Sequence, residues 1–167
     1  MSFFIPYQIL FSFYILSFIG LLIVSESKNV DIGIGDSWYA PINDSCKILF
    51  IDTPEQAYIE YNEESIVSEV SHIQQIKDKL FGETYSGKYF SFDLVDKKYI
   101  EYQSFMELSK SENLNSVKLI KVIDFYEERK SNVAGIAIIL VGILSLLISI
   151  SLAVITFRLI IFGKIKK

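Results

Sequence analysis

The residues best suited to chemistry are few and stand far apart in the chain. His72 is the only histidine and Cys46 the only cysteine among the 167 residues. A zinc site needs several Cys, His or carboxylate ligands, and a nucleophilic site needs a base beside the nucleophile. We therefore expect His72 to be a packed or surface side chain, with pH sensing as the alternative. Cys46 stands at the start of an apolar run, which favours a small buried hydrophobe over an intermolecular disulfide.

Two further motifs resemble functional sites only superficially. Asp52 and Glu55 could form a pair of carboxylates, but the intervening Thr53-Pro54 favours a capped helix start, where an acidic residue complements the helix dipole. The segment Gly33-Ile34-Gly35 lacks the third glycine of a dinucleotide-binding loop. The sequence therefore predicts no catalytic, cofactor-binding or metal-ligating residue, and it favours a protein that is not an enzyme.

Two long apolar segments predict membrane-spanning helices. Residues 3–24 contain no charge over 22 positions, and residues 133–157 form a second apolar run of 25. At a rise of about 1.5 Å per residue, the first segment reaches about 33 Å, enough for a hydrocarbon core of about 30 Å. A cleaved signal peptide is the alternative for this segment, with cleavage after Ser27, but Met1-Ser2 supplies no basic start. The sequence favours a retained anchor.

The distribution of charge predicts the orientation of the chain. Residues 26–130 hold all 20 acidic and 12 of the 16 basic residues, whereas residues 158–167 are basic and contain no acid. Short basic flanks stay in the cytoplasm, so the C-terminal tail is expected inside and the acidic domain on the non-cytoplasmic side. An acidic domain also argues against nucleic acid as a partner. The residues expected to set this topology are Arg158, Lys164, Lys166 and Lys167.

The segment between the spans predicts an α+β domain over residues 46–126, preceded by a linker over residues 25–45. Cys46 to Asp52 predicts a buried strand. Residues 54–81 then predict a helix that ends at Gly82 and is either continuous or broken near Asn62. The helix prediction depends on one apolar stripe, formed by Ile59, Ile66, Val70, Ile73, Ile76 and Leu80.

The remainder of this domain predicts a hairpin, a short helix and a last strand. Alternating apolar residues over 88–95 and 98–103 predict the hairpin, with a tight turn between its strands. Ser104 and Glu107 form a capping box for the short helix, and residues 116–125 predict the last strand. The resulting order, β-α-β-β-α-β, is ferredoxin-like.

Small residues recur on one face of the second apolar segment at spacings of four and seven. Such a face allows close approach of another helix and hydrogen bonding through hydroxyl groups. The partner is either the first span, where Ser17 and Gly20 offer a matching patch, or another membrane protein or a second copy. The residues expected to pack are Gly135, Gly142, Ser145, Ser149, Ala153 and Thr156.

These observations favour a non-enzymatic accessory subunit or assembly factor that is anchored in a lipid bilayer. One alternative is a membrane-bound sensor whose sheet binds a ligand through Tyr89, Tyr99, Glu101 and Tyr102. A second alternative is an immunity-type membrane protein that blocks a toxin or a phage.

Overall fold

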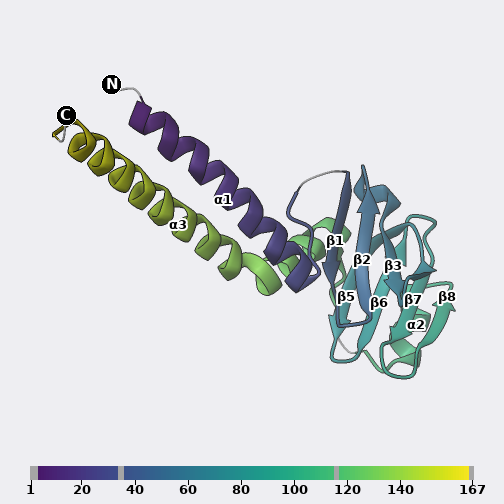
Figure 1. The fold of residues 1–167 in the computed structure, drawn as a ribbon. Coiled ribbons are helices and arrows are strands. Elements are labelled where there is room, and N and C mark those ends of the chain that lie inside the picture. Colours follow the sequence, from purple (N-terminus) through teal and green to yellow (C-terminus); the bar gives the residue numbers. More distant parts are fainter. Residues whose placement is uncertain (1–3, 34–35, 115–116, 166–167) are drawn as a thin grey trace. The chain divides into compact units, whose positions relative to one another are not determined.

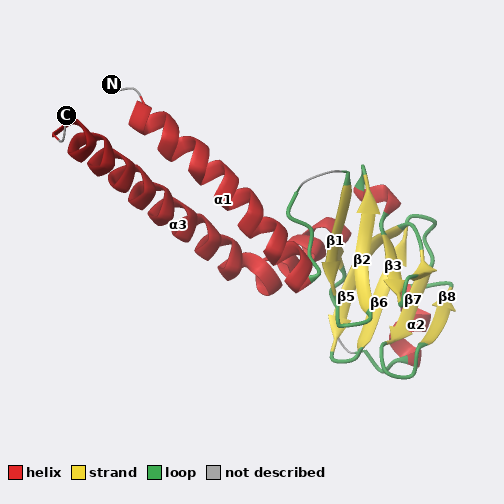
Figure 2. Ribbon diagram, viewed as in Figure 1, coloured by secondary structure: helices red, strands yellow, loops and turns green. Residues whose placement is uncertain are grey.

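The computed structural model describes residues 4–33, 36–114 and 117–165 of the chain. The chain divides into two compact units, one of residues 1–32 with 134–167 and the other of residues 33–133. Among the described residues the fold is α+β, with three α-helices and two antiparallel sheets (Figure 1 and Figure 2).

The first unit contains α1 (Phe4–Lys28) and most of α3 (Val122–Ile165), which run antiparallel (Figure 1). Both helices are long and apolar enough to cross a membrane, as the sequence predicts. A helix suits such segments because, in a bilayer, each backbone polar group must be paired within the segment. α1 continues past Val24, and α3 begins well before Val133. Phe3, the first residue of the predicted span, lies outside the described residues.

The first sheet of the second unit has the strand order β1-β2-β3-β4, and every neighbouring pair is antiparallel. Its strands are β1 Ser37–Pro41, β2 Cys46–Ile51, β3 Tyr58–Tyr61 and β4 Glu64–Val67. The predicted strand from Cys46 is confirmed as β2, which buries Cys46, Ile48 and Phe50. The predicted linker over residues 25–45 is not entirely irregular, because it contains β1. The residues of β1 pair with β2 along its whole length.

The second sheet has the order β8-β7-β6-β5-β9, again with antiparallel neighbours. Its strands are β5 Val70–Ile76, β6 Lys79–Thr84, β7 Tyr89–Asp93, β8 Lys98–Tyr102 and β9 Ile120–Lys121. The predicted hairpin is confirmed as β7 and β8, with Tyr89 opposite Tyr102 and Asp93 opposite Lys98.

The two sheets are connected by a very short segment and by a ring contact. Only Ser68 and Glu69 separate β4 from β5, and Glu69 adopts a left-handed conformation with φ of 56°. The rings of Tyr61 in β3 and Phe92 in β7 meet edge to face, with centroids 5.7 Å apart. Strands that change sheet at such a corner are common in two-sheet folds.

Both faces of the second sheet are covered. Leu80, Phe90 and Phe92 lie buried on one face. On the other face, α2 (Phe105–Ser111) places Leu108 in a buried cluster with Phe81 and Tyr102.

The start of α3 belongs to the core of the second unit. Tyr126 is fully buried, and its ring contacts those of Phe50 and Trp38 with centroids 5.3 and 6.0 Å apart. Val122 and Phe125 are buried as well. One helix therefore contributes to the domain core through its first turns and supplies a candidate span through the rest.

The predicted helix over residues 54–81 is wrong. Only Pro54–Gln56 is helical, as one 3₁₀ turn, and most of the remainder forms β3, β4, β5 and the first half of β6. Thr53 makes no side-chain capping bond there. The segment is rich in Ile, Val and Tyr, which favour strands, and its turns use left-handed residues that the apolar stripe does not reveal. The ferredoxin-like order is accordingly not confirmed.

The short helix after the hairpin is confirmed, whereas the last strand is mostly wrong. Ser104 Oγ accepts a hydrogen bond from the Glu107 amide at 3.2 Å, and Glu107 Oε2 accepts one from the Gln103 amide at 2.9 Å. In place of a strand over residues 116–125, only Ile120–Lys121 pairs with β5, and α3 then begins at Val122. The first residue of that predicted strand, Ser116, lies outside the described part of the chain.

Candidate functional site

The small residues predicted to pack are found along α3 in the helical unit. Ser145, Ser149 and Ala153 are buried, with exposed fractions of 4, 0 and 2%. Gly135 and Thr156 are half-buried. Because α1 is the other long helix of this unit, these side chains lie in a contact within the chain itself.

The two helices approach each other closely at a glycine of α1. A Cβ on Gly20 would lie 2.6 Å from a γ-methyl of Val141, so only glycine fits without a shift. A Cβ on Gly142 would meet nothing within 4 Å. Gly142, although it belongs to the predicted stripe, is therefore not the point of close contact.

A polar contact joins the same two helices. Gln8 Nε2 donates a hydrogen bond of 2.9 Å to Thr156 Oγ1, which itself donates to the Leu152 carbonyl at 2.9 Å. Ser149 Oγ instead donates to the Ser145 carbonyl, within α3. Gln8 was not among the predicted contact residues, although an amide in an otherwise apolar span signals an interhelical hydrogen bond. Its Oε1 atom is buried and has no hydrogen-bond partner among the described residues.

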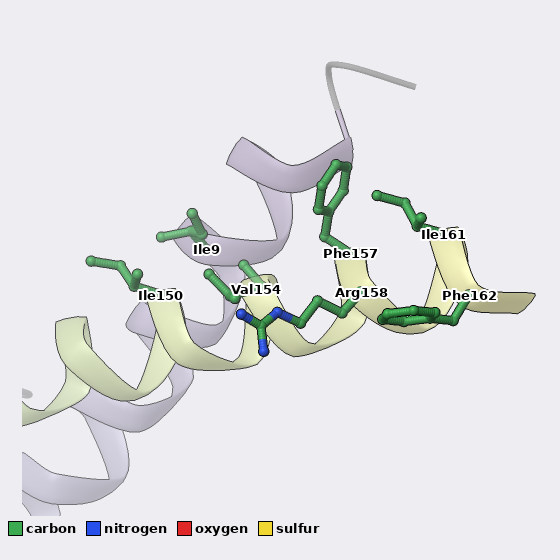
Figure 3. Close-up of a pocket in the computed structure, with 8 residues that line it drawn as sticks. Ile9, Ile150, Val154, Phe157, Arg158, Ile161 and Phe162 are labelled. Atoms are coloured by element: carbon green, nitrogen blue, oxygen red, sulfur yellow. The ribbon is translucent and has the colours of Figure 1, made fainter.

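An apolar groove lies beside this contact, near the end of the unit that carries both chain termini (Figure 3). Its volume is about 540 Å³. It is lined by Ile9 from α1 and by four residues of α3, Ile150, Val154, Phe157 and Phe162. Arg158 is the charged residue in the lining, and Figure 3 shows its side chain extended back along α3 toward Val154.

Of the residues expected to set topology, the structure describes only one side chain. Arg158 is exposed and makes no ion pair with any described residue. The side chain of Lys164 and the whole of Lys166 and Lys167 lie outside the described part of the chain.

The isolated chemical residues of the domain have structural surroundings. Cys46 is buried in β2, as expected, and burial, with the nearby Glu60, raises the pKa of its thiol to about 12. His72 Nδ1 lies 3.6 Å from Glu83 Oε2 on the face that α2 partly covers. Asp52 and Glu55 are exposed in the turn after β2.

The densest polar cluster in the domain surrounds Glu112, at the end of α2. Its Oε1 accepts hydrogen bonds from Tyr102 at 3.0 Å and Ser91 at 3.1 Å, and its Oε2 contacts Lys79 Nζ at 2.8 Å. Burial raises the pKa of the Glu112 carboxyl, but these hydrogen bonds lower it by more, so it lies below its ordinary value. A carboxylate bound in this way holds α2 on the sheet.

The residues proposed for a ligand-binding face do not share one surface. Strand pairing places Tyr89 and Tyr102 on the face toward α2, whereas Tyr99 and Glu101 alternate with them on the opposite face. Tyr102 is almost fully buried and already bonded to Glu112. The ligand-sensor hypothesis therefore loses the surface on which it depends.

Among the described residues, no group of three or more His, Cys, Asp or Glu could hold a metal ion. No protein-family model matches the chain, and comparisons with curated proteins and with solved structures give no match either. The geometry of the chain itself is therefore the basis for a functional proposal.

Proposed function

We propose that this protein is a non-enzymatic accessory subunit or assembly factor, anchored in a membrane by a two-helix hairpin. The observation that carries the proposal is α3, which supplies buried residues to the β domain and continues as a candidate span. A small domain built into its own anchor suits a protein that acts by contact at a membrane.

In this proposal a partner does not bind the small-residue face of α3. Ser145, Ser149 and Ala153 on that face are already buried, which supports α1 as its neighbour within the chain. A partner would therefore contact the outward surfaces of the hairpin or the domain. Within the domain, the most exposed large apolar side chain described is Met106 at 80%, on α2, with Phe105 beside it at 38%. We propose this surface of α2 as the contact with a partner protein.

The proposed orientation places both termini in the cytoplasm and the domain on the non-cytoplasmic side. Antiparallel spans put the two termini on one side of a bilayer. The basic residues after Phe157 support the cytoplasm as that side, because short basic flanks are retained there. Retention of α1 is supported by its bond from Gln8 to Thr156, and by the position of Ser27 inside the helix.

The proposal is tested with the full chain at native expression, extracted in mild detergent and separated on a native gel. We expect a complex larger than the protein alone. Met106→Glu should reduce this complex because a charge on the α2 surface opposes docking of an apolar partner. Val95→Glu is the matched control, since Val95 is also exposed, at 67%, but lies in the β7–β8 turn. Migration of the wild type as a lone monomer would contradict the proposal.

A further inference from the structure

The apolar groove of the helical unit ends at a cation. Its walls are apolar and are formed by Ile9, Ile150, Val154, Phe157 and Phe162. Its volume of about 540 Å³ falls within the range of roughly 300–1,000 Å³ that is typical of ligand pockets. Arg158 is the charged member of the lining, and Figure 3 shows its guanidinium beside Val154 rather than directed away from the groove. The site thus combines a long apolar surface with one positive group.

The hydrogen bond between Gln8 and Thr156 shows which part of α1 lies beside Arg158. Thr156 is bonded to Gln8, so Arg158, two residues farther on, is level with the first turn of α1. Apolar residues lie both before and after Arg158 in α3. In a bilayer spanned by both helices, this level is where hydrocarbon gives way to headgroups, within reach of a long basic side chain.

We propose that this groove binds an anionic phospholipid of the leaflet at the chain termini, with one acyl chain along the groove and the phosphate on Arg158. The inference rests on the proposed membrane anchoring. Charge complementarity selects the occupant: the guanidinium makes no ion pair with a described residue, and the tail that follows contains three lysines and no acid. Guanidinium groups match phosphate oxygens in a bidentate geometry. Basic sites beside membrane helices bind anionic headgroups in this way.

The test uses the purified full chain in mild detergent, equilibrated with equal amounts of phosphatidylglycerol and phosphatidylcholine that carry identical acyl chains. Native mass spectrometry then reports which lipid stays bound. We expect wild-type protein to retain phosphatidylglycerol about fivefold over phosphatidylcholine, the preference that one basic residue provides near an anionic headgroup. Arg158→Gln should reduce this ratio to about one.

Two further variants separate the two parts of the site. Lys28→Gln removes a positive charge from the opposite end of α1 and should leave the preference unchanged. Val154→Trp fills the groove and should lower retention of both lipids. A wild-type ratio of one, a preference that survives Arg158→Gln, or an equal loss in Lys28→Gln would each overturn the proposal.

Carbonate extraction of the membranes from which the protein is purified distinguishes failure of the lipid site from failure of the proposed function. If wild-type protein is released by carbonate, the membrane anchoring itself is wrong, and the lipid site with it. If the protein stays in the membrane and shows no lipid preference, only the lipid site is overturned.

Discussion

Glu112 places a carboxylate, with its side chain 11% exposed, against the core of the five-stranded sheet, where three side chains hydrogen-bond to it. Its pKa is lower in the folded state than in the unfolded chain. The stabilisation is therefore present above the unfolded value of about 4.3 and is lost as the pH falls through the folded value.

We expect Glu112→Gln to lower the free energy of unfolding by about 1–2 kcal/mol at neutral pH, because the charged acceptor of Lys79 is lost. The variant should also show a shallower loss of stability than wild type between about pH 5 and pH 3. Denaturant titration of the full chain in detergent measures both effects. Trp38, the only tryptophan, reports on the domain because it stacks on Phe50 with a centroid distance of 5.7 Å.

The matched control for this prediction is Glu101→Gln. Glu101 pairs with Lys88 at 2.7 Å, but both side chains are exposed, so its removal should leave the denaturation midpoint and its pH dependence unchanged. Equal effects of the two variants would contradict a special role for Glu112.

Gly82 is a second residue with a sharp structural requirement. A Cβ there would overlap the Phe90 ring and lie 2.8 Å from the His72 carbonyl oxygen. Gly82→Ala should therefore destabilise the domain by about 1–3 kcal/mol through overpacking, measured by the same titration. Combining it with Phe90→Leu should cost less than the sum of the two single changes, because the smaller side chain makes room for the methyl group. Strict additivity would show that Phe90 is not what excludes a side chain.

At the scale of elements, local chemistry was predictable and the long-range pairing was not. The capping box of Ser104 and Glu107 lies within one turn, so the sequence alone predicts α2. The apolar run from Cys46 and the alternation through Phe90 and Phe92 likewise predict β2 and β7. In each case the signal and the structure occupy the same few residues.

The strands between Tyr58 and Thr84 were missed because their turns carry unusual residues. Asn62 and Glu63 both adopt positive φ, of 48° and 68°, and Lys77 turns the next hairpin with φ of 54°. Glu and Lys rarely adopt this conformation, and neither turn contains the Gly or Pro by which a turn is usually recognised in a sequence. When these turns are not recognised, the spacing of the apolar residues from Ile59 to Leu80 fits one helix as well as it fits several strands.

For the candidate site in the helices, the sequence indicates a small-residue face on α3 and a matching patch with Gly20 on α1, but not that Gly20 meets Val141 or that Gln8 bonds to Thr156. Atoms of the other helix lie close to Gly20 but not to Gly142. The spacing of small residues in the sequence does not show which of the two glycines is close to a neighbour. Gly20→Leu should therefore force α1 from α3, whereas Gly142→Leu should not.

Cross-linking of the two helices measures this difference. In a Cys46→Ser background, cysteines replace Gln8 and Thr156, whose side chains hydrogen-bond at 2.9 Å, and a short thiol-reactive linker joins them. We expect efficient cross-linking in the parent and in Gly142→Leu, and a several-fold loss in Gly20→Leu. Equal yields in both leucine variants would contradict the contact at Gly20.

At the scale of the whole molecule, the proposed topology makes a labelling prediction. Cys46 is 1% exposed and its thiol has a pKa of about 12, so the wild-type chain should not react with a membrane-impermeant maleimide near neutral pH. Cysteines introduced at Ser86 in the domain and at Lys167 in the tail then report on opposite sides. In intact cells, Ser86→Cys should be labelled, and Lys167→Cys only after the cells are permeabilised.

Denaturation before labelling is the control, because it should expose Cys46 and yield signal from every variant. Labelling of Lys167→Cys in intact cells would place the tail outside and reverse the proposed orientation. Labelling of both cysteines in intact cells would mean that the tail and the domain lie on the same side.

The dual use of α3 has a consequence for biosynthesis. Val122, Phe125 and Tyr126 complete the core of the domain, yet they leave the ribosome after all of the described strands and immediately before the apolar part of α3. The domain can therefore finish folding only while that span is being synthesised and inserted. A nascent chain that stops short of Val122 would display the rings of Trp38 and Phe50 without their partner and become a substrate for chaperones and proteases.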